Sequence, residues 1–200
     1  MSAALAPTLH PLFLKLDGKE VLVVGGGRVA EAKIVDLAAT GARVRVVSPK
    51  VTSRVEALAR AGKIRWHRRA FWTTDVDGAW LVIAATSDPD VQRSASDAAD
   101  ARRTFAVAVD DLPNGSAYSA AVLRRAPFTI AVSSSGEAPA LARLLREILE
   151  QVLPEHGWVD AARALREKWR RDKTPMDSRF GELVRVFRVR ATTPSVPRAS

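Results

Sequence analysis

The sequence EVLVVGGGRVAEAK, from Glu20 to Lys33, decides the fold of this 200-residue chain. An apolar run of strand length leads into three glycines, and a helix-compatible run follows them directly. The spacing Gly25-x-Gly27-x-x-Ala30 fits the G-x-G-x-x-G/A pattern, in which glycines allow a tight turn and a close approach of a pyrophosphate to the backbone. The stretch therefore predicts a dinucleotide site, and the alternative is a glycine-rich turn that binds no ligand.

Predicted strands and helices alternate from Glu20 to residue 109. The five strands are short and mostly strongly apolar, and they cover residues 20–24, 43–47, 64–67, 79–84 and 105–109. The helices cover residues 28–40, a stretch that begins at Thr52 or Ser53, and a stretch that begins at Asp88 or Asp90. Short apolar strands without polar alternation are typical of parallel sheets covered on both faces. The pattern predicts an α/β fold with a doubly wound, Rossmann-like parallel sheet.

The pattern changes after Asp111. A turn precedes two β-like segments, 116–123 and 127–133, which are separated by Arg124-Arg125-Ala126. A helix follows from Ala138 to about residue 152, and then one or two basic amphipathic helices. The last ten residues are predicted to be disordered. The predicted divisions of the chain are residues 1–112, 113–153, 154–190 and 191–200.

The composition excludes several kinds of site. The chain has no cysteine, so it holds no disulfide, thiolate zinc site, iron–sulfur cluster or cysteine nucleophile. Its three histidines, His10, His67 and His156, have no neighbour at metal-ligand spacing, and no metal site is expected. No apolar run reaches membrane-spanning length, and residues 1–7 do not form a signal peptide. These features predict a cytoplasmic protein with no membrane partner.

Positive charge is concentrated towards the C-terminus. The chain carries a net charge of +9, and the segment from Arg163 to Ser200, with eleven basic and four acidic residues, carries +7 of it. A basic segment favours an anionic partner, which can be nucleic acid, a membrane surface or a polyanionic small molecule. The alternative is a solvated helical face.

Ligands of doubly wound sheets bind beyond the carboxyl ends of the strands. Four predicted loops meet there: Gly25 to Arg28, Ser48 to Lys50, Ala85 to Asp88, and Asp110 with Asp111. The acidic residue that binds the adenosine ribose in many such folds, about twenty residues past the glycines, is absent. The ribose must then be held by backbone, by Ser48 or by Lys50. Because Lys50 can also accommodate a 2′-phosphate, the choice between NAD and NADP stays open.

Two polar clusters have more than one interpretation. Asp110 and Asp111 follow the fifth predicted strand directly, where a carboxylate beside a bound nicotinamide is a candidate general base. The alternative is an aspartate that caps a turn. Ser133, Ser134 and Ser135 precede a helix, where their hydroxyls and amides can bind an anion or simply cap the helix.

Several segments together resemble the dehydrogenase module of sirohaem synthases, a family of precorrin-2 dehydrogenases that in several members are also sirohydrochlorin ferrochelatases. The resemblance covers roughly residues 10–155 and depends on the combination of segments. These are HPLF at 10–13, VVGGGRVAEAK at 23–33, GAR at 41–43, VSP at 47–49, LVIAATSD at 81–88, VD at 109–110 and AVSSSGEAPALARLLRE at 131–147.

The resemblance implies three domains: an NAD-binding Rossmann domain over residues 1–112, a dimerisation region with interlocking partner chains over 113–153, and a C-terminal helical domain over 154–190. It implies that a homodimer oxidises precorrin-2 to sirohydrochlorin with NAD in sirohaem biosynthesis. The substrate is a polycarboxylate tetrapyrrole, so a small-molecule polyanion is favoured for the basic tail and no nucleic-acid partner is expected.

The resemblance also assigns roles to individual residues. Asp110 becomes the general base, with Asp111 second. Contacts with the cofactor fall on Gly25, Gly26, Gly27, Arg28, Val29, Pro49, Lys50, Ala85 and Thr86, to which the missing ribose acid adds Ser48. Because the implied substrate carries many carboxylates, Arg124 and Arg125 are candidate partners for them, and Ser134 of the serine cluster is a further candidate for binding this anion.

Three residues depart from the family pattern. Val107 stands where relatives often have Asn, Ala120 where they have Pro, and Ser135 where they have Gly. Val107 and Ala120 lie near the expected pocket and leave the chelatase activity and the identity of the substrate open. Two alternatives for the function follow. One is a bifunctional enzyme that also inserts Fe²⁺ into sirohydrochlorin, and the other is a non-catalytic module that senses nucleotides or binds nucleic acid.

Overall fold

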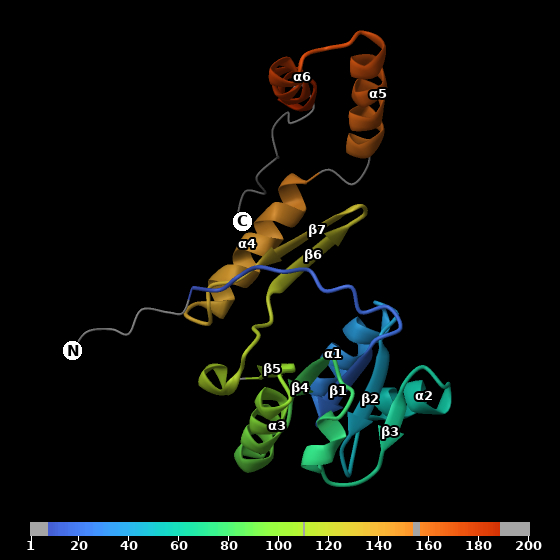
Figure 1. Cartoon of the computed structure of the whole chain (residues 1–200), viewed down its shortest axis with the longest axis vertical. Helices are drawn as coiled ribbons and strands as arrows, with labels where there is room; N and C mark the ends of the chain where they lie inside the picture. The colour runs from blue at the N-terminus through green and yellow to red at the C-terminus, as the bar shows by residue number, and fades with distance from the viewer. Residues whose placement is uncertain (1–7, 110, 154–156, 189–200) are drawn as a thin grey trace, which may run out of the picture. The chain divides into compact units, whose positions relative to one another are not determined.

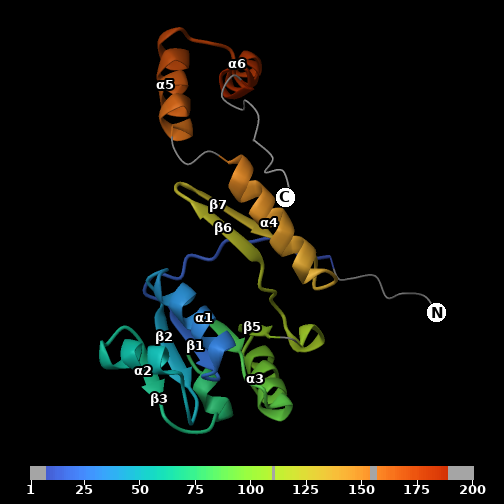
Figure 2. The same cartoon turned by 180° about the vertical axis from the view of Figure 1, so that it is seen from behind.

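The computed structural model describes residues 8–109, 111–153 and 157–188 of the chain. Two compact units follow one another in sequence, one ending at Ser119 and the other beginning at Ala120. Figures 1 and 2 show the elements of each unit from opposite sides. The segment 191–200, which the sequence predicts to be disordered, lies outside the described residues.

The first unit is built on a parallel sheet of five strands in the order β3-β2-β1-β4-β5 (Figure 1). The strands are β1 (Glu20–Val24), β2 (Arg43–Val47), β3 (Arg65–His67), β4 (Leu81–Ala84) and β5 (Phe105–Ala108). Val24 lies opposite Val47 on one side and Ala84 on the other, and Ala84 lies opposite Ala108. The carboxyl ends of the strands therefore share one edge, and the predicted α/β fold with a parallel sheet is confirmed.

Helices cover both faces of this sheet. They are α1 (Arg28–Ala38), α2 (Ser53–Arg60) and α3 (Pro89–Ala101). Val21 and Val23 of β1 belong to a buried cluster that includes Ile34 of α1, whereas Leu22 belongs to a second cluster that includes Ala95 of α3. These five side chains have no solvent exposure. A strand buried on both faces has no polar side, which is why β1 is a continuous apolar run.

The order of the strands reverses beside β1. The chain runs from β1 through β2 to β3 and then crosses back to β4 on the other side of β1. The connection contains a 3₁₀ helix, η1 (Thr73–Val76), whose Asp75 forms an ion pair with Arg69. The crevice where strand order reverses is the usual ligand site of doubly wound sheets. A ligand is therefore expected to bind at the loops after β1 and β4.

The outer edge of β5 is covered by the chain that follows it. Ala106 donates its backbone N–H to Ser116 Oγ at 2.9 Å, and its carbonyl oxygen accepts the N–H groups of Ser116 and Ala117. A second 3₁₀ helix, η2 (Leu112–Asn114), makes the turn. The prediction of a β-like segment from residue 116 is wrong at its start, because residues 116 and 117 pair with this edge and the next strand begins at Ala121.

The second unit begins with an antiparallel hairpin of β6 (Ala121–Arg125) and β7 (Phe128–Val132), and α4 (Pro139–Val152) packs against it. Leu123 of β6 and Ala142 of α4 are buried. Arg124 and Arg125 were predicted to separate two segments, but they are the last residues of β6. A strand with one solvated face accepts charged residues. The turn of the hairpin therefore lies at residues 126–127, later in the chain than predicted.

Two basic helices, α5 (Trp158–Arg171) and α6 (Met176–Arg188), complete the described chain. They contact one another through Trp169, whose indole N–H donates a 2.9 Å hydrogen bond to Glu182 Oε2. Lys168 forms a 3.4 Å ion pair with the same carboxylate. Across residues 8–109, 111–153 and 157–188, no helix has the length and apolar character needed to cross a membrane.

Candidate functional site

Three loops meet at the carboxyl edge of the sheet. The glycine loop, residues 25–27, lies between the loops that follow β2 and β4. Gly25 donates its backbone N–H to the carbonyl oxygen of Val47 at 3.0 Å, and Thr52 donates to the carbonyl oxygen of Gly26 at 3.0 Å. On the other side, Ala85 donates to the carbonyl oxygen of Val24 at 2.8 Å. The loops of β1, β2 and β4 therefore form one connected backbone surface.

Two of the three glycines are required by the packing of the protein itself. Gly25 has φ of +117°, and a Cβ atom there would collide with the carbonyl oxygen of Ala85 and lie 2.7 Å from its carbon. A Cβ atom on Gly26 would collide with the carbonyl oxygen of Lys50 and lie 2.7 Å from Val51 Cγ1. These glycines bring the three loops into direct contact, and any larger side chain would separate them.

Gly27 is different, because its packing against the described residues does not require a glycine. Apart from its chain neighbours, no atom of the described residues lies within 4 Å of the position that its Cβ would occupy, and its φ of −75° is one that any residue adopts. It is the N-cap residue of α1, whose first amides receive no hydrogen bond from a capping side chain. Open space beside uncapped helix amides is what the phosphates of a dinucleotide require. The described residues therefore fit a dinucleotide at this loop.

Arg28 and Val29 continue the glycine loop into the first turn of α1, and both are exposed. Val29 has half of its side chain exposed, at 50%, although the neighbouring Ala30 is fully buried. The predicted contact residues of this segment thus lie on the solvent side of the helix start, beside Gly27.

The loop after β2 is shaped by Ser48. Its side chain is buried and donates a hydrogen bond from Oγ to the carbonyl oxygen of Lys50 at 2.6 Å. Its own carbonyl oxygen accepts the indole N–H of Trp66 at 2.9 Å. Pro49 and Lys50 are exposed. Ser48 therefore holds the loop in shape, and the side chains that face solvent at this position are those of Pro49 and Lys50.

The loop after β4 leads into α3. Ala85 is buried against the glycine loop, and Thr86 Oγ1 accepts the backbone N–H of Asp88 at 3.2 Å. The carboxylate of Asp88 accepts the N–H groups of Asp90 at 3.0 Å and Val91 at 3.2 Å. Asp88 is thus the N-cap of α3, one of the two caps that the sequence predicts.

The end of β5 is fixed by a residue that the sequence analysis missed. Val109 donates its N–H to the carbonyl oxygen of Ala84 at 3.0 Å, and its carbonyl oxygen accepts Nε2 of Gln92 at 2.6 Å. Gln92 belongs to α3 and is buried. Asp110, the predicted base, lies outside the described residues. A buried polar position on the apolar face of a predicted helix is the signal that points to Gln92.

Asp111 has a structural role. Its carboxylate accepts Nδ2 of Asn114 at 2.7 Å, and its carbonyl oxygen accepts the backbone N–H of the same residue at 3.2 Å. These two hydrogen bonds close the turn at η2. Asp111 therefore makes the contacts expected of an aspartate that caps a turn.

The predicted substrate contacts belong to the second unit. Ser134 Oγ accepts the backbone N–H of Ala138 at 3.0 Å, so this hydroxyl stabilises the start of α4. Arg125 donates from Nη1 to the carbonyl oxygen of Leu153 at 2.5 Å, and Arg124 is exposed on the same strand. Ser135, which replaces a family glycine, has φ of 52°. A glycine at that position would adopt the left-handed conformation without strain.

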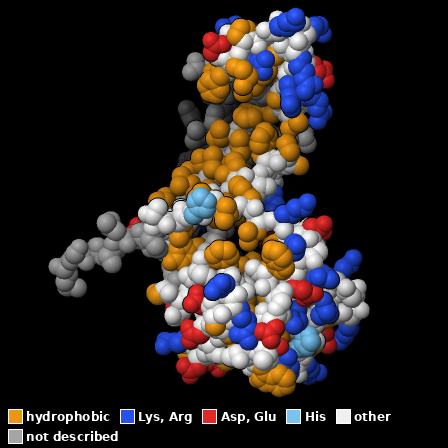
Figure 3. Space-filling model, in the orientation of Figure 1, with side chains coloured by type: hydrophobic (Ala, Val, Ile, Leu, Met, Phe, Trp, Pro, Cys, Tyr) orange, Lys and Arg blue, Asp and Glu red, His pale blue; other side chains and the backbone are white. Residues whose placement is uncertain are grey.

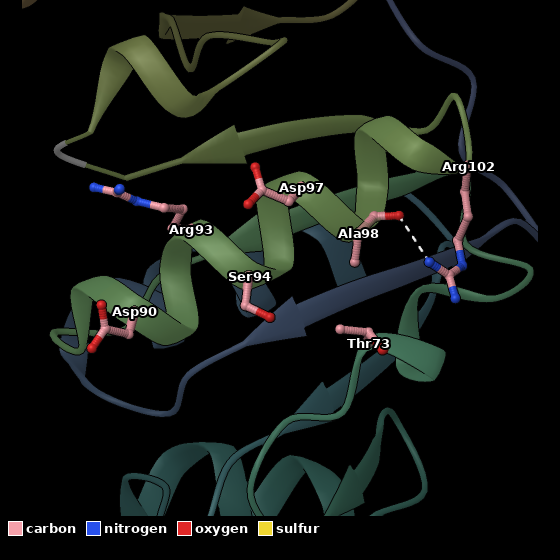
Figure 4. Close-up of a pocket in the computed structure, with 7 residues that line it drawn as sticks. All are labelled: Thr73, Asp90, Arg93, Ser94, Asp97, Ala98 and Arg102. Atoms are coloured by element: carbon pink, nitrogen blue, oxygen red, sulfur yellow. Dashed lines mark hydrogen bonds between the residues drawn. The ribbon is translucent and has the colours of Figure 1, made fainter.

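A groove of about 430 Å³ lies away from these loops, on the flank of α3. Figure 4 shows its residues along the helix, with Thr73 of η1 opposite them and Arg102 donating to the carbonyl oxygen of Ala98 at 3.1 Å. None of the predicted cofactor or substrate residues lines this groove. Within the described ranges, no three acidic or histidine side chains gather in a way that could hold a metal ion.

Comparisons with known proteins cover nearly the whole of this architecture. A family model described as "Putative NAD(P)-binding" matches residues 12–121, and a model described as "Sirohaem biosynthesis protein central" matches residues 125–151. Among solved structures, "SirC, precorrin-2 dehydrogenase" superposes with a TM-score of 0.71 at 22% identity over 89% of each chain, which shows a shared fold.

Curated relatives include "Siroheme synthase 1" of Aeromonas salmonicida, 44% identical over 146 residues, which are 73% of this chain and 31% of the relative. "Siroheme synthase 1" of Cronobacter sakazakii is 46% identical over 144 residues, 72% of this chain and 31% of the relative. This chain spans about a third of the length of these relatives. The predicted resemblance to the sirohaem synthase module is confirmed, and since the first family model matches more than half of its residues, the chain belongs to the putative NAD(P)-binding family.

Proposed function

We propose that this protein is an NAD-dependent dehydrogenase that oxidises precorrin-2 to sirohydrochlorin in sirohaem biosynthesis. The observation that carries the proposal is the glycine loop. Gly27 leaves open space beside uncapped amides of α1, in a chain 44% identical to a siroheme synthase over 146 residues. The same stretch that organises the sheet thus provides the surface on which a dinucleotide is to bind.

Loops on both sides of the strand-order reversal would hold the dinucleotide. Gly27 and the first amides of α1, beside Arg28 and Val29, would bind its phosphates. Pro49 and Lys50 would contact the adenosine part, and Ala85 and Thr86 the nicotinamide part. When bound, NAD supplies the acceptor for a hydride.

The second requirement of this oxidation is an acceptor for the proton that leaves the substrate with the hydride. Asp110 has this role in the proposal. It directly follows Val109, whose N–H and carbonyl groups are both hydrogen-bonded, to Ala84 and Gln92. The support for this role is that the residue next to it in the chain is held through both of its backbone polar groups, and proton transfer requires a well-positioned base.

The carboxylate arms of the substrate need cationic and hydrogen-bonding partners. Arg124 and Arg125 are adjacent on β6, and the bond of Arg125 to Leu153 uses one of the five N–H groups of its guanidinium. Ser134 accepts one hydrogen bond and still has a hydroxyl proton to donate. The proposal assigns these three residues to substrate binding, and the basic surface of α5 and α6 to attracting the polyanion.

The proposed enzyme is a homodimer, and the support for this is the apolar stripe of α4. This stripe consists of five side chains at helical spacing, each between 43% and 59% exposed: Leu141, Leu144, Leu145, Ile148 and Val152. Figure 3 shows hydrophobic side chains gathered over α4 and the hairpin. Exposed apolar surface of this kind is typical of a protein interface. A second copy of the chain covers this stripe in the proposal, which makes residues 113–153 the dimerisation region.

The proposal is tested with the variant Asp110→Ala, assayed anaerobically with precorrin-2 and NAD. The expected result is loss of NADH formation with an unchanged circular dichroism spectrum and unchanged dinucleotide binding. The exposed aspartate Asp97 of α3 provides the control variant Asp97→Ala, which keeps the wild-type rate. A wild-type rate of NADH formation in Asp110→Ala would show that Asp110 is not the general base.

Three sequence-based expectations stay predictions. One is insertion of Fe²⁺ into sirohydrochlorin, which is measured as sirohaem formation above the uncatalysed rate. The second is the cytoplasmic location. The third is the absence of a nucleic-acid partner, which a salt-dependent shift of DNA or RNA by the basic helices would contradict.

A further inference from the structure

The turn after β5 contains Asn114, which is the one asparagine of the chain and is followed by a glycine. Asparagine is a thermolabile residue, because the backbone nitrogen of the next residue can attack its side-chain amide. A glycine in that position favours the attack, since it has no side chain to obstruct it. Asn114 is the last residue of η2 and is half-buried. It is therefore the position of this chain most prone to deamidation.

In the folded protein, two hydrogen bonds to Asp111 hold Asn114. Its side-chain Nδ2 donates to Asp111 Oδ2 at 2.7 Å, and its backbone N–H donates to the carbonyl oxygen of Asp111 at 3.2 Å. The attack requires the side chain of Asn114 to rotate towards the nitrogen of Gly115, which breaks the bond from Nδ2. Deamidation therefore starts from an opened turn, and its rate depends on how often the turn opens.

The residues that follow lie close against the edge of β5. A Cβ atom on Gly115 would lie 3.2 Å from the backbone nitrogen of Ala108. The carbonyl oxygen of Ala106 accepts the N–H of Ser116 at 2.9 Å, and the N–H of Ala106 donates to Ser116 Oγ at 2.9 Å. This turn segment, residues 111–117, thus covers the outer edge of β5 and leaves little room for a longer backbone.

We propose that Asn114 deamidates spontaneously, that its bonds to Asp111 slow this reaction, and that the product releases the turn segment from β5. The backbone nitrogen of Gly115 attacks Cγ of Asn114 and loses its proton, the Cγ–Nδ2 bond breaks, and ammonia leaves as a succinimide ring forms. Water then opens the ring at one of its two carbonyl carbons, which gives aspartate or isoaspartate. No oxidant or reductant takes part, and the inference does not depend on the proposed function.

The turn accommodates neither product well. A carboxylate in place of the amide removes the Nδ2 donor and faces the carboxylate of Asp111, so a 2.7 Å hydrogen bond is replaced by repulsion between like charges. Isoaspartate also lengthens the backbone by one carbon just before Gly115, whose packing against β5 is close. Deamidation is therefore a one-way change that uncovers the edge of β5, where unpaired backbone groups become exposed.

The test is mass spectrometry of the full chain after incubation in mildly alkaline buffer, followed by peptide mapping, since replacement of the amide by a carboxyl group changes the mass. The variant Asp111→Ala removes the acceptor of the Asn114 side chain, and Asp97→Ala, at an exposed position of α3, is the matched control. Asn114→Gln keeps an amide that reacts more slowly, because a larger ring must form. The wild-type chain unfolded in urea gives the rate without the turn.

We expect the folded wild type and Asp97→Ala to deamidate at Asn114 at one rate, more slowly than the chain in urea. Folded Asp111→Ala reacts about tenfold faster than the folded wild type, as loss of a hydrogen bond to a charged group implies. Asn114→Gln keeps its amide over the same period. Asn114→Asp, which carries one of the two products, unfolds at a lower urea concentration than the wild type.

A folded wild type that keeps Asn114 intact while the urea-unfolded chain loses the amide overturns the proposal. Equal rates in Asp111→Ala and the wild type overturn the role of Asp111, and unfolding of Asn114→Asp at the wild-type urea concentration overturns the release of the turn segment. If Asp111→Ala does not fold, equal rates for the folded and the unfolded wild type overturn the protection by the turn.

Discussion

Gln92 and Val109 connect α3 to the end of β5. Nε2 of Gln92 donates to the carbonyl oxygen of Val109 at 2.6 Å, and the side chain of Gln92 is only 5% exposed. A buried amide that satisfies a backbone carbonyl has a strong structural reason to be polar. Val109 immediately precedes Asp110, so this bond fixes the residue next to the proposed base in the chain.

The variant Gln92→Met tests this positioning role. It keeps the side-chain length but leaves the Val109 carbonyl without its partner, which costs about 1–2 kcal/mol of unfolding free energy. We expect kcat for precorrin-2 oxidation to fall about 10- to 100-fold through misplacement of the base. The dissociation constant for NAD stays near the wild-type value. The neighbouring exposed residue provides the control Arg93→Met, and equal kcat in the two variants would contradict the role of Gln92.

The glycine loop allows a comparison between two substitutions that look the same in sequence. Gly25→Ala places a Cβ against the Ala85 carbonyl at a φ of +117°, so the variant unfolds at lower denaturant concentration or fails to fold. The Cβ of Gly27→Ala has no atom of the described residues within 4 Å other than those of its chain neighbours. This variant is expected to keep its unfolding free energy, or to gain about 0.4–1 kcal/mol from a less flexible unfolded chain.

Only dinucleotide binding distinguishes the functional role of Gly27. In Gly27→Ala we expect the affinity for NAD to fall at least about tenfold, since the methyl group occupies the space of the phosphates. The two measurements are urea unfolding and calorimetric titration of the same preparations. If Gly27→Ala binds NAD with the wild-type affinity, the phosphates of the dinucleotide do not bind beside Gly27.

The ion pair of Asp75 with Arg69 makes stability depend on pH. Burial alone raises the pKa of Asp75, but the hydrogen bonds from Arg69 and from the Trp72 N–H, with the charges of Arg69 and Arg45, lower it overall. A carboxyl whose folded pKa is below its unfolded value stabilises the protein above the unfolded value, about 3.8. That contribution is lost as the pH falls through the folded pKa.

We therefore expect Asp75→Asn to lose about 2–3 kcal/mol of unfolding free energy at pH 7. The difference from the wild type should shrink as the pH is lowered from about 3.8 through the lower pKa that Asp75 has in the folded protein, where its carboxyl becomes protonated. The exposed pair of Asp77 with Arg102 provides the control Asp77→Asn, with a loss under about 1 kcal/mol. Urea unfolding across this pH range measures both, and a constant difference would contradict the account.

The apolar stripe of α4 predicts that the oligomeric state depends on single side chains. Leu144→Glu and Ile148→Glu place charges on the exposed face and leave the buried contact of Ala142 with the hairpin intact. We expect sedimentation analysis to show dimers for the wild type and monomers for these variants, because charge within an apolar interface is strongly unfavourable. Arg143→Gln, on the same helix but paired with Glu147, is the control and stays dimeric. A monomeric wild type would contradict the proposed homodimer.

The sequence predicts the sheet well because its signals are local. The apolar run before Gly25, the cap at Asp88 and the apolar strands depend on neighbouring residues alone, and the structure confirms each of them. The distinction between Gly25 and Gly27 depends on the Ala85 loop, some sixty residues further along the chain. The contact of Gln92 with Val109 likewise exists only after the sheet has formed. Such long-range contacts leave no periodic pattern in the sequence.

The hairpin shows a second limit. Arg124-Arg125 has the polar character of a turn, yet both residues lie in β6, whose buried side is supplied by Leu123. Side chains alternate along a strand, so Arg124 lies on the exposed face while Arg125, on the side of Leu123, is half-buried and reaches the carbonyl oxygen of Leu153 after α4. Whether such a pair ends a strand or continues it therefore depends on α4, which is distant in the sequence. The 3₁₀ helix η1 was also missed, because its position depends on the pair of Asp75 with Arg69.

Anaerobic incubation of the wild-type chain with precorrin-2 and NAD, followed by absorption spectroscopy, measures the proposed oxidation itself. We predict that sirohydrochlorin and NADH appear together in equal amounts, at a rate proportional to the protein concentration. Tight binding of NAD without any conversion of precorrin-2 would contradict it, since the glycine loop would then serve a nucleotide-binding protein that does not carry out this oxidation.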